Sequence, residues 1–177
     1  LGYKAMARKY SGDDPDVTQL TEICSEVVLT TEHEGIRFLQ GEGVGIVTLP
    51  GLGLEIGGPA INKTPRAMME TIVRRHYPTG GVDITVSIPA GRELASKTFN
   101  PRLGIIDGIS VVGTSGVVKP FSSEAFVASI VRQADVAVAL GADTIVINSG
   151  AKSEKYLKSA FPELPFQSFI QYGNFIG

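Results

Sequence analysis

Residues 99–116, FNPRLGIIDGISVVGTSG, decide the fold of this chain, because strand formers and turn residues alternate in them over a short distance. Two β-branched runs, Ile105–Ile106 and Ile109–Val112, are too short for helices and predict buried strands. Asn100-Pro101 predicts a turn before them, and the cation Arg102 follows it directly. The glycines of this stretch allow backbone N–H groups to approach a ligand closely, and tight packing of crossing strands explains them equally well.

The composition is that of a globular protein and excludes several classes of partner. The 177 residues, 43% of them hydrophobic, are enough for one large domain or two small ones with a real core. A net charge of −2 provides no basic surface, so we expect no nucleic-acid partner. The single cysteine fits a reducing compartment, and no apolar run approaches the roughly 20 residues of a membrane-spanning helix. With no export signal, these features predict a cytoplasmic protein without a membrane partner.

An acidic turn lies near the start of the chain. The segment GDDPDVT at residues 12–18 places Asp13, Asp14 and Asp16 around a proline. Like charges this close repel unless a cation or a set of N–H donors meets them, and a metal or a ligand hydroxyl would also serve. The favoured interpretation is a solvated turn that caps the segment after it.

The segments beside this turn predict a β-hairpin. Residues 24–31 and 36–39 have the composition of two strands, with His33 near the turn that joins them. Residues 1–10 are interpreted as the end of a helix. Neither His33 nor His76 has a cysteine or carboxylate at metal-ligand spacing, so we expect no metal site.

Residues 41–58, GEGVGIVTLPGLGLEIGG, are rich in glycine. By count, Gly41, Gly43 and Gly45 resemble a nucleotide-binding loop, but that pattern needs a strand before the glycines and a helix after them. Here a predicted strand at 46–49 follows the glycines, which argues against a phosphate site. The glycines instead predict sharp bends and close packing against another surface, a flat ligand among the alternatives.

A helix and a strand follow. Thr64-Pro65 predicts an N-cap and first helical residue for a helix over 65–76, with Ala67, Met68, Ile72 and Val73 toward the core. Residues 82–88 alternate apolar and polar side chains, which predicts a half-buried strand. A turn and a short helical piece that carries Lys97 then lead into the central stretch.

The last third predicts alternating helices and strands. A helix capped by Ser122 or Ser123 runs to about residue 140, and its predicted core residues recur at helical spacing: Phe126, Ile130, Ala134 and Val138. Residues 144–148 form an apolar strand of parallel-sheet character, and residues 149–152 turn into a further helix that carries Glu154. Such a turn is an anion-binding geometry, although many bind nothing. Residues 166–177 begin another such unit.

The pattern therefore predicts two domains. Residues 1–118 form an α+β domain, whose mixed sheet contains the hairpin, residues 46–49, residues 82–88 and the two central strands. Residues 119–177 form the start of a three-layer α/β domain, apparently truncated.

Taken together, these segments resemble one family, the cobalt-precorrin-5B C1-methyltransferases of anaerobic cobalamin biosynthesis. The resemblance covers nearly everything from Gly12 onward. It implies that this chain is the middle of such a protein, since family members have a further N-terminal segment and much more sequence at the other end. Relatives tend to carry arginine after Gly150, where this chain has alanine. The segments that carry the resemblance are GDDPDVT (12–18), GEGVGIVTLPGL (41–52), GGPAIN (57–62), KTFNPRLGIIDGISVVGTSGVVKP (97–120), SGAKSEKY (149–156) and QYGNFIG (171–177).

The resemblance implies an S-adenosylmethionine-dependent methyltransferase that converts cobalt-precorrin-5B to cobalt-precorrin-6A, with cobalt present only in the substrate. Methyl transfer needs alignment and exclusion of water rather than a protein nucleophile, so no catalytic residue is assigned. Self-association into a homo-oligomer is left open.

The resemblance also places candidate binding residues. The substrate bears many carboxylates, so we expect cationic side chains at its binding site. The candidate cations around the glycine-rich segments are Lys63, Arg66, Arg92, Lys97, Arg102 and Lys119. Loops 41–45, 100–104 and 113–116 are expected to form one face for the macrocycle, and the turn at 149–152 to face it. A carboxylate is expected on the ribose or sulfonium of the cofactor, and Asp13 is a further candidate for it. The predicted substrate-binding residues are Arg102, Asn100, Gly104, Lys63, Arg66, Lys119, Thr114 and Ser115; the cofactor-binding residues are Gly41, Gly43, Gly45, Ser149, Gly150, Lys152, Glu154, Asp14 and Asp16.

Two functions from other classes remain open. A non-catalytic tetrapyrrole carrier or scaffold of the same pathway would bind the pigment but not S-adenosylmethionine. A phosphate-binding α/β enzyme would use the turn at Ser149 and bind a nucleotide instead.

Overall fold

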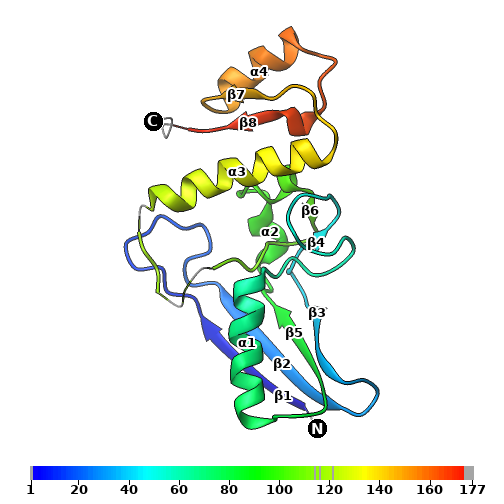
Figure 1. The fold of residues 1–177 in the computed structure, drawn as a ribbon. Helices are drawn as coiled ribbons and strands as arrows, with labels where there is room; N and C mark the ends of the chain where they lie inside the picture. The colour runs from blue at the N-terminus through cyan, green and yellow to red at the C-terminus, as the bar shows by residue number, and fades with distance from the viewer. Residues whose placement is uncertain (1, 114, 116, 121, 174–177) are drawn as a thin grey trace. The chain divides into compact units, whose positions relative to one another are not determined.

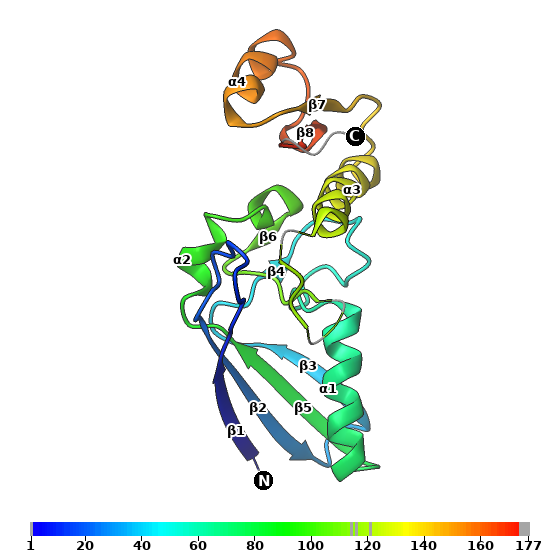
Figure 2. The same cartoon turned by 90° about the vertical axis from the view of Figure 1, so that its left-hand side faces the viewer.

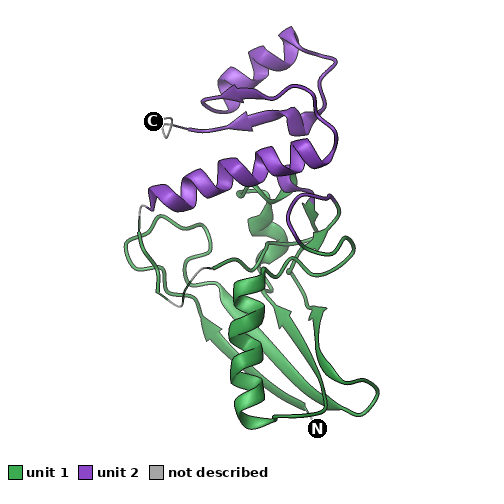
Figure 3. Cartoon of the chain, in the orientation of Figure 1, with its two compact units in different colours: residues 1–48, 54–101, 105–120 green, residues 49–53, 102–104, 121–177 purple. Residues whose placement is uncertain are grey.

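A computed structural model describes residues 2–113, 115, 117–120 and 122–173. The chain forms two compact units (Figure 3). Unit 1 contains residues 1–48, 54–101 and 105–120, and unit 2 contains residues 49–53, 102–104 and 121–177. Two short stretches of the first part of the chain thus belong to unit 2, which the sequence does not predict. The division into two domains after residue 118 stays a prediction.

Unit 1 is built on a sheet of four strands, which is mixed, as predicted, but differs from the prediction in its strands. Its order is β1 (Gly2–Arg8), β2 (Glu22–Thr30), β5 (Gly81–Ser87) and β3 (Gly35–Gln40), and only the β3–β5 pair is parallel. Helix α1 (Lys63–His76) lies against one face of the sheet (Figures 1 and 2). The core gathers around β5 and the segments that cross it, and its buried residues are Val44, Ile61, Val82, Ile84, Val86, Ile88 and Ile109.

The predicted hairpin and the predicted N-terminal helix are both wrong. Strands β2 and β3 do not pair, because β5 lies between them. Strand β5 is the most buried strand of this sheet, and its residues Val82, Ile84 and Val86 belong to the core. Residues 2–8 form β1 because they pair with β2 along their whole length; this long-range pairing outweighs a sequence without clear periodicity.

Helix α1 begins two residues earlier than predicted, at Lys63 rather than Pro65. Its N-cap is Asn62 rather than Thr64, so the proline lies within the first turn, where its missing N–H costs nothing. Met69 and Val73 pack on the core, whereas Met68 and Ile72 are 46% and 53% exposed. Ala67 is exposed as well, so the predicted core face was wrong at these three positions and right at Val73, because the helix turns Met69 and Val73 toward the sheet.

The central stretch does not join the main sheet. Strands β4 (Ile46–Val47) and β6 (Ile105–Ile106) form a separate antiparallel pair. Ile109 and Val111 make only isolated bridges, and the predicted turn at Asn100 is a short 3₁₀ helix, η1 (Asn100–Leu103). The prediction of one sheet was wrong here because closely spaced glycines end each pairing after two residues.

Unit 2 contains the predicted alternation of helices and strands. Ser122 caps α3 (Ser123–Ala139) by accepting a hydrogen bond from the Ala125 N–H at 3.1 Å, and Gly141 follows the helix with φ +80°. Strand β7 (Val146–Asn148), helix α4 (Ala151–Ala160), helix η2 (Phe166–Ser168) and strand β8 (Phe169–Gln171) follow, with β7 and β8 parallel. A third layer stays a prediction.

Two predicted core positions of unit 2 are exposed. Val138 is 63% exposed, because α3 buries the face of Gln133, Val136 and Ala137 instead. Ile147 is 55% exposed, so β7 is covered on one side only. Among the described residues, no helix combines the length and apolarity needed to cross a bilayer.

Three glycines hold the crossing segments of unit 1 together. A Cβ added to Gly91 would lie 2.0 Å from the Gly43 carbonyl oxygen, and one added to Gly108 would lie 2.2 Å from the same atom. Gly43 itself has φ +70°, and its Cβ would lie 1.9 Å from the Ile88 carbonyl oxygen. Helix α2 (Gly91–Ala95) and the loop after β6 therefore meet on one peptide group, which we call the glycine crossing.

We predict that Gly43→Ala lowers the free energy of unfolding by about 3 kcal/mol or more, because it adds a backbone clash to an unfavourable φ. Gly12→Ala is the matched control, since Gly12 has φ +58° and nothing within 4 Å of its Cβ position. It should cost only about 1 kcal/mol. Denaturant titration of both variants measures the difference, and equal losses would show that close packing at Gly43 is unimportant.

Candidate functional site

A polar hollow of about 460 Å³ opens in unit 1 beside the glycine crossing. The end of β3, the turn after β5, the first turn of α2 and the loop after β6 bring its residues together. We call it the glycine-loop hollow, and its lining residues are Gln40, Gly41, Glu42, Gly43, Pro89, Arg92 and Asp107.

Side-chain charges dominate this hollow. The Arg92 Nη2 lies 3.6 Å from the Asp107 Oδ1, and the two side chains are 79% and 51% exposed. An ion pair this exposed contributes about 0–1 kcal/mol to folding, so its groups are available to a ligand. Asp107 has φ +61°, a conformation that aspartate tolerates better than most residues. The sequence contains a signal for it, because Asp-Gly is a turn dipeptide.

The glycine amides that we expected to meet a ligand bind the chain itself. The Gly41 N–H donates to the Val86 carbonyl oxygen and the Gly45 N–H to the Ile109 carbonyl oxygen, each at 2.9 Å. The close packing predicted for residues 41–58 thus accounts for these two glycines. Recognition of a ligand in the hollow would depend mainly on side chains.

A second cluster of charges lies buried in unit 2, and we call it the Arg102–Glu154 cluster. The Arg102 Nη2 donates to the Glu154 Oε2 at 2.7 Å, and the two side chains are only 17% and 6% exposed. The Arg102 Nη1 donates to the Phe169 carbonyl oxygen at 3.2 Å, and the guanidinium lies 4.9 Å from the centre of the Phe166 ring. Lys158 lies 2.7 Å from the other carboxylate oxygen. Arg102 does not point into bulk solvent; it joins η1 to α4 and β8.

Burial and hydrogen bonding act in opposite directions on Glu154. Burial favours the neutral carboxyl, but hydrogen bonds from Lys158, Gln171 and Arg102 hold the pKa of Glu154 below its ordinary value of 4.5. The carboxylate is therefore charged at neutral pH and has three donors around it. Such saturation is typical of a structural ion pair, and the predicted contact of Glu154 with a cofactor stays a prediction.

Several other predicted site residues make internal contacts. Asn100 is buried and its Oδ1 accepts from the Ser110 hydroxyl at 3.0 Å. The Arg66 guanidinium donates to two backbone carbonyl oxygens, at 2.8 and 3.1 Å, and burial lowers its pKa. The Asp16 carboxylate pairs with Lys9 and accepts from the Thr18 N–H and hydroxyl, so a cation and an N–H donor meet its charge.

The remaining predicted residues differ in exposure. Gly104 is buried against Leu49, and the Gly150 N–H donates to the Asn148 Oδ1 at 3.1 Å. Thr114 lies outside the described residues. The exposed ones are Lys63, Lys119, Ser115, Ser149 and Lys152; Asp13 is exposed as well, and Asp14 is half-buried.

The shared face for the macrocycle also stays a prediction. Loop 41–45 lies in unit 1, whereas residues 102–104 lie in unit 2. In the third loop, residues 114 and 116 are outside the described part. Within that described part, no three or more His, Cys, Asp or Glu side chains come together as metal ligands.

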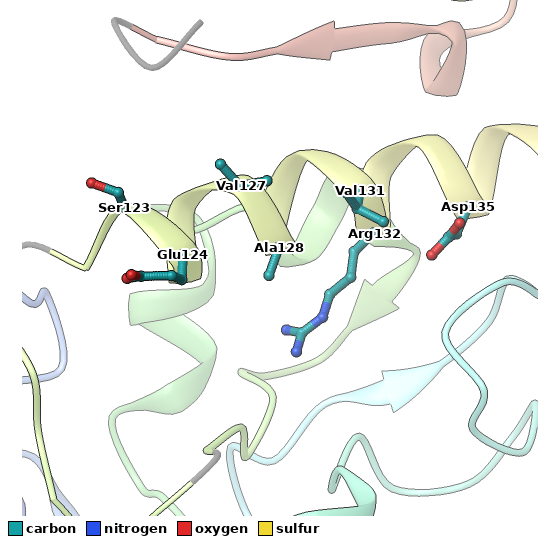
Figure 4. A pocket seen from close by; sticks show the side chains of 7 residues that line it. All are labelled: Ser123, Glu124, Val127, Ala128, Val131, Arg132 and Asp135. Carbon is teal, nitrogen blue, oxygen red and sulfur yellow. The ribbon is translucent and has the colours of Figure 1, made fainter. Parts of the chain in front are cut away.

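A further hollow, of about 670 Å³, follows the side of α3. Figure 4 shows that all of its lining side chains project from this one helix. Val127 and Val131 are 49% and 51% exposed, and charged residues flank them. The helical spacing that predicted α3 does not reveal this face. Its lining residues are Ser123, Glu124, Val127, Ala128, Val131, Arg132 and Asp135.

Comparison with known proteins decides the family. The sequence profile of the CbiD family matches residues 2–120, about two thirds of the chain. The chain belongs to the CbiD family. Its resemblance to the cobalt-precorrin-5B C1-methyltransferases is thereby confirmed.

Curated relatives of this CbiD chain include proteins named cobalt-precorrin-5B C(1)-methyltransferase. The relative from Prosthecochloris aestuarii is 48% identical over 182 residues, which cover 99% of this chain and 49% of that protein. The relative from Variovorax paradoxus is 44% identical over 97% of this chain and 48% of that protein. A crystal structure of a cobalamin biosynthesis protein (cbiD) from Archaeoglobus fulgidus is 30% identical, with a TM-score of 0.49 over 96% of this chain and 54% of that one. The chain spans about half the length of the curated relatives it matches.

We predict that Glu154→Gln destabilises the protein by about 3 kcal/mol at pH 7, because it leaves Arg102 and Lys158 without their buried counter-charge. A carboxyl whose pKa is lowered on folding stabilises the fold above its ordinary value of 4.5, and this contribution disappears as pH falls through the folded pKa. The difference between wild type and variant should therefore shrink at acid pH.

Glu22→Gln provides the control for this prediction, because the Arg8–Glu22 pair at 3.2 Å has side chains that are 68% and 44% exposed. It should change the unfolding free energy by less than about 1 kcal/mol. Denaturant titrations from pH 3 to pH 8 test both variants. A Glu154→Gln effect as small as that of the control would contradict the structural role of the cluster.

Proposed function

We propose that the protein carrying this chain transfers a methyl group from S-adenosylmethionine to carbon C1 of cobalt-precorrin-5B, giving cobalt-precorrin-6A. One observation carries the proposal: membership of the CbiD family over residues 2–120. The curated relatives support it, since proteins 43–48% identical to this chain bear the name of that activity.

The chemistry requires little covalent help from the protein. An electron pair on ring carbon C1 attacks the methyl carbon, the bond from that carbon to the sulfonium sulfur breaks, and its electrons remain on sulfur as S-adenosylhomocysteine. Such an in-line displacement depends on alignment and on exclusion of water. It needs no activated serine or cysteine.

Exposed cations of unit 1 are suited to the carboxylates of the macrocycle. Lys63 begins α1 and Lys119 follows the central stretch, and both side chains are exposed. Charge-assisted bonds from such lysines to carboxylates would bind the pigment without taking part in the displacement. Arg66 and Arg102 make internal contacts, so we assign them to positioning the segments around them.

Methyl transfer by the complete natural protein tests the proposal. Incubated without oxygen with cobalt-precorrin-5B and S-adenosylmethionine labelled with ¹³C in its methyl group, it should give a labelled product whose methyl is assigned to C1 by NMR. Pigment binding without transfer, and without heat on addition of S-adenosylmethionine, would show a carrier instead. A melting temperature raised by a nucleotide but not by S-adenosylmethionine would indicate a phosphate-binding enzyme.

We predict that Lys63→Gln and Lys119→Gln each raise the KM for the pigment about threefold to tenfold and leave kcat nearly unchanged, because they remove binding that is equal in ground and transition states. Lys155→Gln, which removes an exposed lysine of α4, is the control and should change neither constant. Steady-state kinetics of the complete protein checks this. A fall in kcat for either variant would place that lysine at the reacting atoms.

A further inference from the structure

The glycine-loop hollow has an excess of negative charge. Glu42 and Asp107 contribute two carboxylates, and Arg92 contributes one guanidinium. The hollow is thus a poor place for the carboxylates of a tetrapyrrole, which the two acidic side chains would repel. It is suited to a ligand that carries more positive charge than negative and that also has one anionic group.

The Arg92–Asp107 ion pair contributes little to folding. The Arg92–Asp107 pair is exposed and 3.6 Å long, in contrast with the 2.7 Å buried pair of Arg102 and Glu154. The backbone of Asp107 nevertheless adopts φ +61°, next to Gly108 at the glycine crossing. A residue held in this conformation at the rim of a hollow is a candidate for function.

The size and donor set define the class of ligand. About 460 Å³ is within the range of small-molecule sites and is larger than a hydrated ion needs. Within the described residues, no cluster of three or more metal-ligating side chains exists. Two carboxylates and one guanidinium complement an organic zwitterion with an additional cationic centre.

We propose that the glycine-loop hollow binds the amino-acid end of S-adenosylmethionine, with Arg92 on its carboxylate and with Glu42 and Asp107 toward its ammonium and sulfonium. The inference rests on the proposed function for the presence of this cofactor, and on the structure for the residues. S-adenosylmethionine has two cationic groups and one carboxylate, and the hollow has two carboxylates and one cation. The charges of ligand and hollow are thus complementary, group by group.

This assignment has a consequence for product release. S-adenosylhomocysteine keeps the ammonium and the carboxylate but loses the sulfonium charge. The hollow should therefore bind S-adenosylmethionine more tightly than S-adenosylhomocysteine, and the carboxylates should be the source of the difference. Arg92 contacts a group that both ligands share, so it should affect both affinities alike.

Calorimetric titration of the complete natural protein with each ligand tests the inference. The wild-type protein should bind S-adenosylmethionine about tenfold more tightly than S-adenosylhomocysteine, which corresponds to a difference in binding free energy of about 1.4 kcal/mol. Glu42→Gln and Asp107→Asn should weaken the binding of S-adenosylmethionine and bring the ratio of the two affinities toward one. Asparagine tolerates the positive φ of residue 107, so the second variant keeps the backbone conformation. Arg92→Gln should lower the affinities for both ligands about threefold to tenfold and leave the ratio of the two affinities unchanged. Circular dichroism and melting curves confirm that each variant is folded.

Two controls and the contrary results complete the experiment. Glu93→Gln removes a carboxylate next to Arg92 that does not line the hollow, and Arg8→Gln removes an exposed arginine of β1; neither should change either affinity. Wild-type affinities in all three hollow variants, in a protein that still transfers methyl groups, would overturn this inference and leave the proposed function intact. A loss of affinity for the pigment but not for S-adenosylmethionine in Arg92→Gln would also overturn this inference and leave the proposed function intact. A wild-type protein that neither binds S-adenosylmethionine nor transfers a methyl group would overturn both.

Discussion

Contact between three glycine backbones is the constraint on which unit 1 depends. The Gly43 carbonyl oxygen lies where a Cβ of Gly91 or of Gly108 would otherwise be, so no side chain fits at either position. The three segments can cross only because each presents bare backbone at the same point. Hydrogen bonds then complete the crossing, for the Ile109 N–H donates to the Gly43 carbonyl oxygen at 3.0 Å and the Ile88 N–H to that of Glu42 at 2.7 Å. The shape of the polar hollow beside it follows, since loop, turn and helix start are fixed there.

The two arginine–carboxylate pairs show how burial separates a structural role from a binding role. Arg102 and Glu154 are shielded from water, and further donors surround the carboxylate, so removal of either partner would leave an uncompensated charge. Arg92 and Asp107 are largely solvated, and their attraction is screened. Charged groups that contribute little to folding can reorganise around a ligand at little cost. For this reason we assign binding to the exposed pair, although the sequence alone drew attention to Arg102.

Local patterns predicted the elements better than their pairing. The alternation over residues 82–88 and the caps of α3 are properties of neighbouring residues, and both elements were found where expected. The position of β5 between β2 and β3 depends on competition among distant strands, which no local pattern contains. The same reason applies to charge pairs. Arg102 and Glu154 are 52 residues apart, and each looks like a solvated surface charge until the fold brings them together. For the hollow, the sequence drew attention to the glycines of loop 41–45 and to Arg92, but no local pattern indicated Asp107 as the partner of Arg92.

The glycine-rich loop bears on how the cofactor that we propose would be recognised. In a dinucleotide-binding fold, glycines leave amides free at the start of a helix, and these amides meet the phosphates. Here the Gly41 and Gly45 amides are already bonded to β5 and to the central stretch. S-adenosylmethionine has no phosphate; its charged groups are an ammonium, a sulfonium and a carboxylate. Carboxylate and guanidinium side chains are the complementary partners for these groups. The glycines therefore supply the geometry of the hollow, and Glu42, Arg92 and Asp107 supply the chemistry we propose for it.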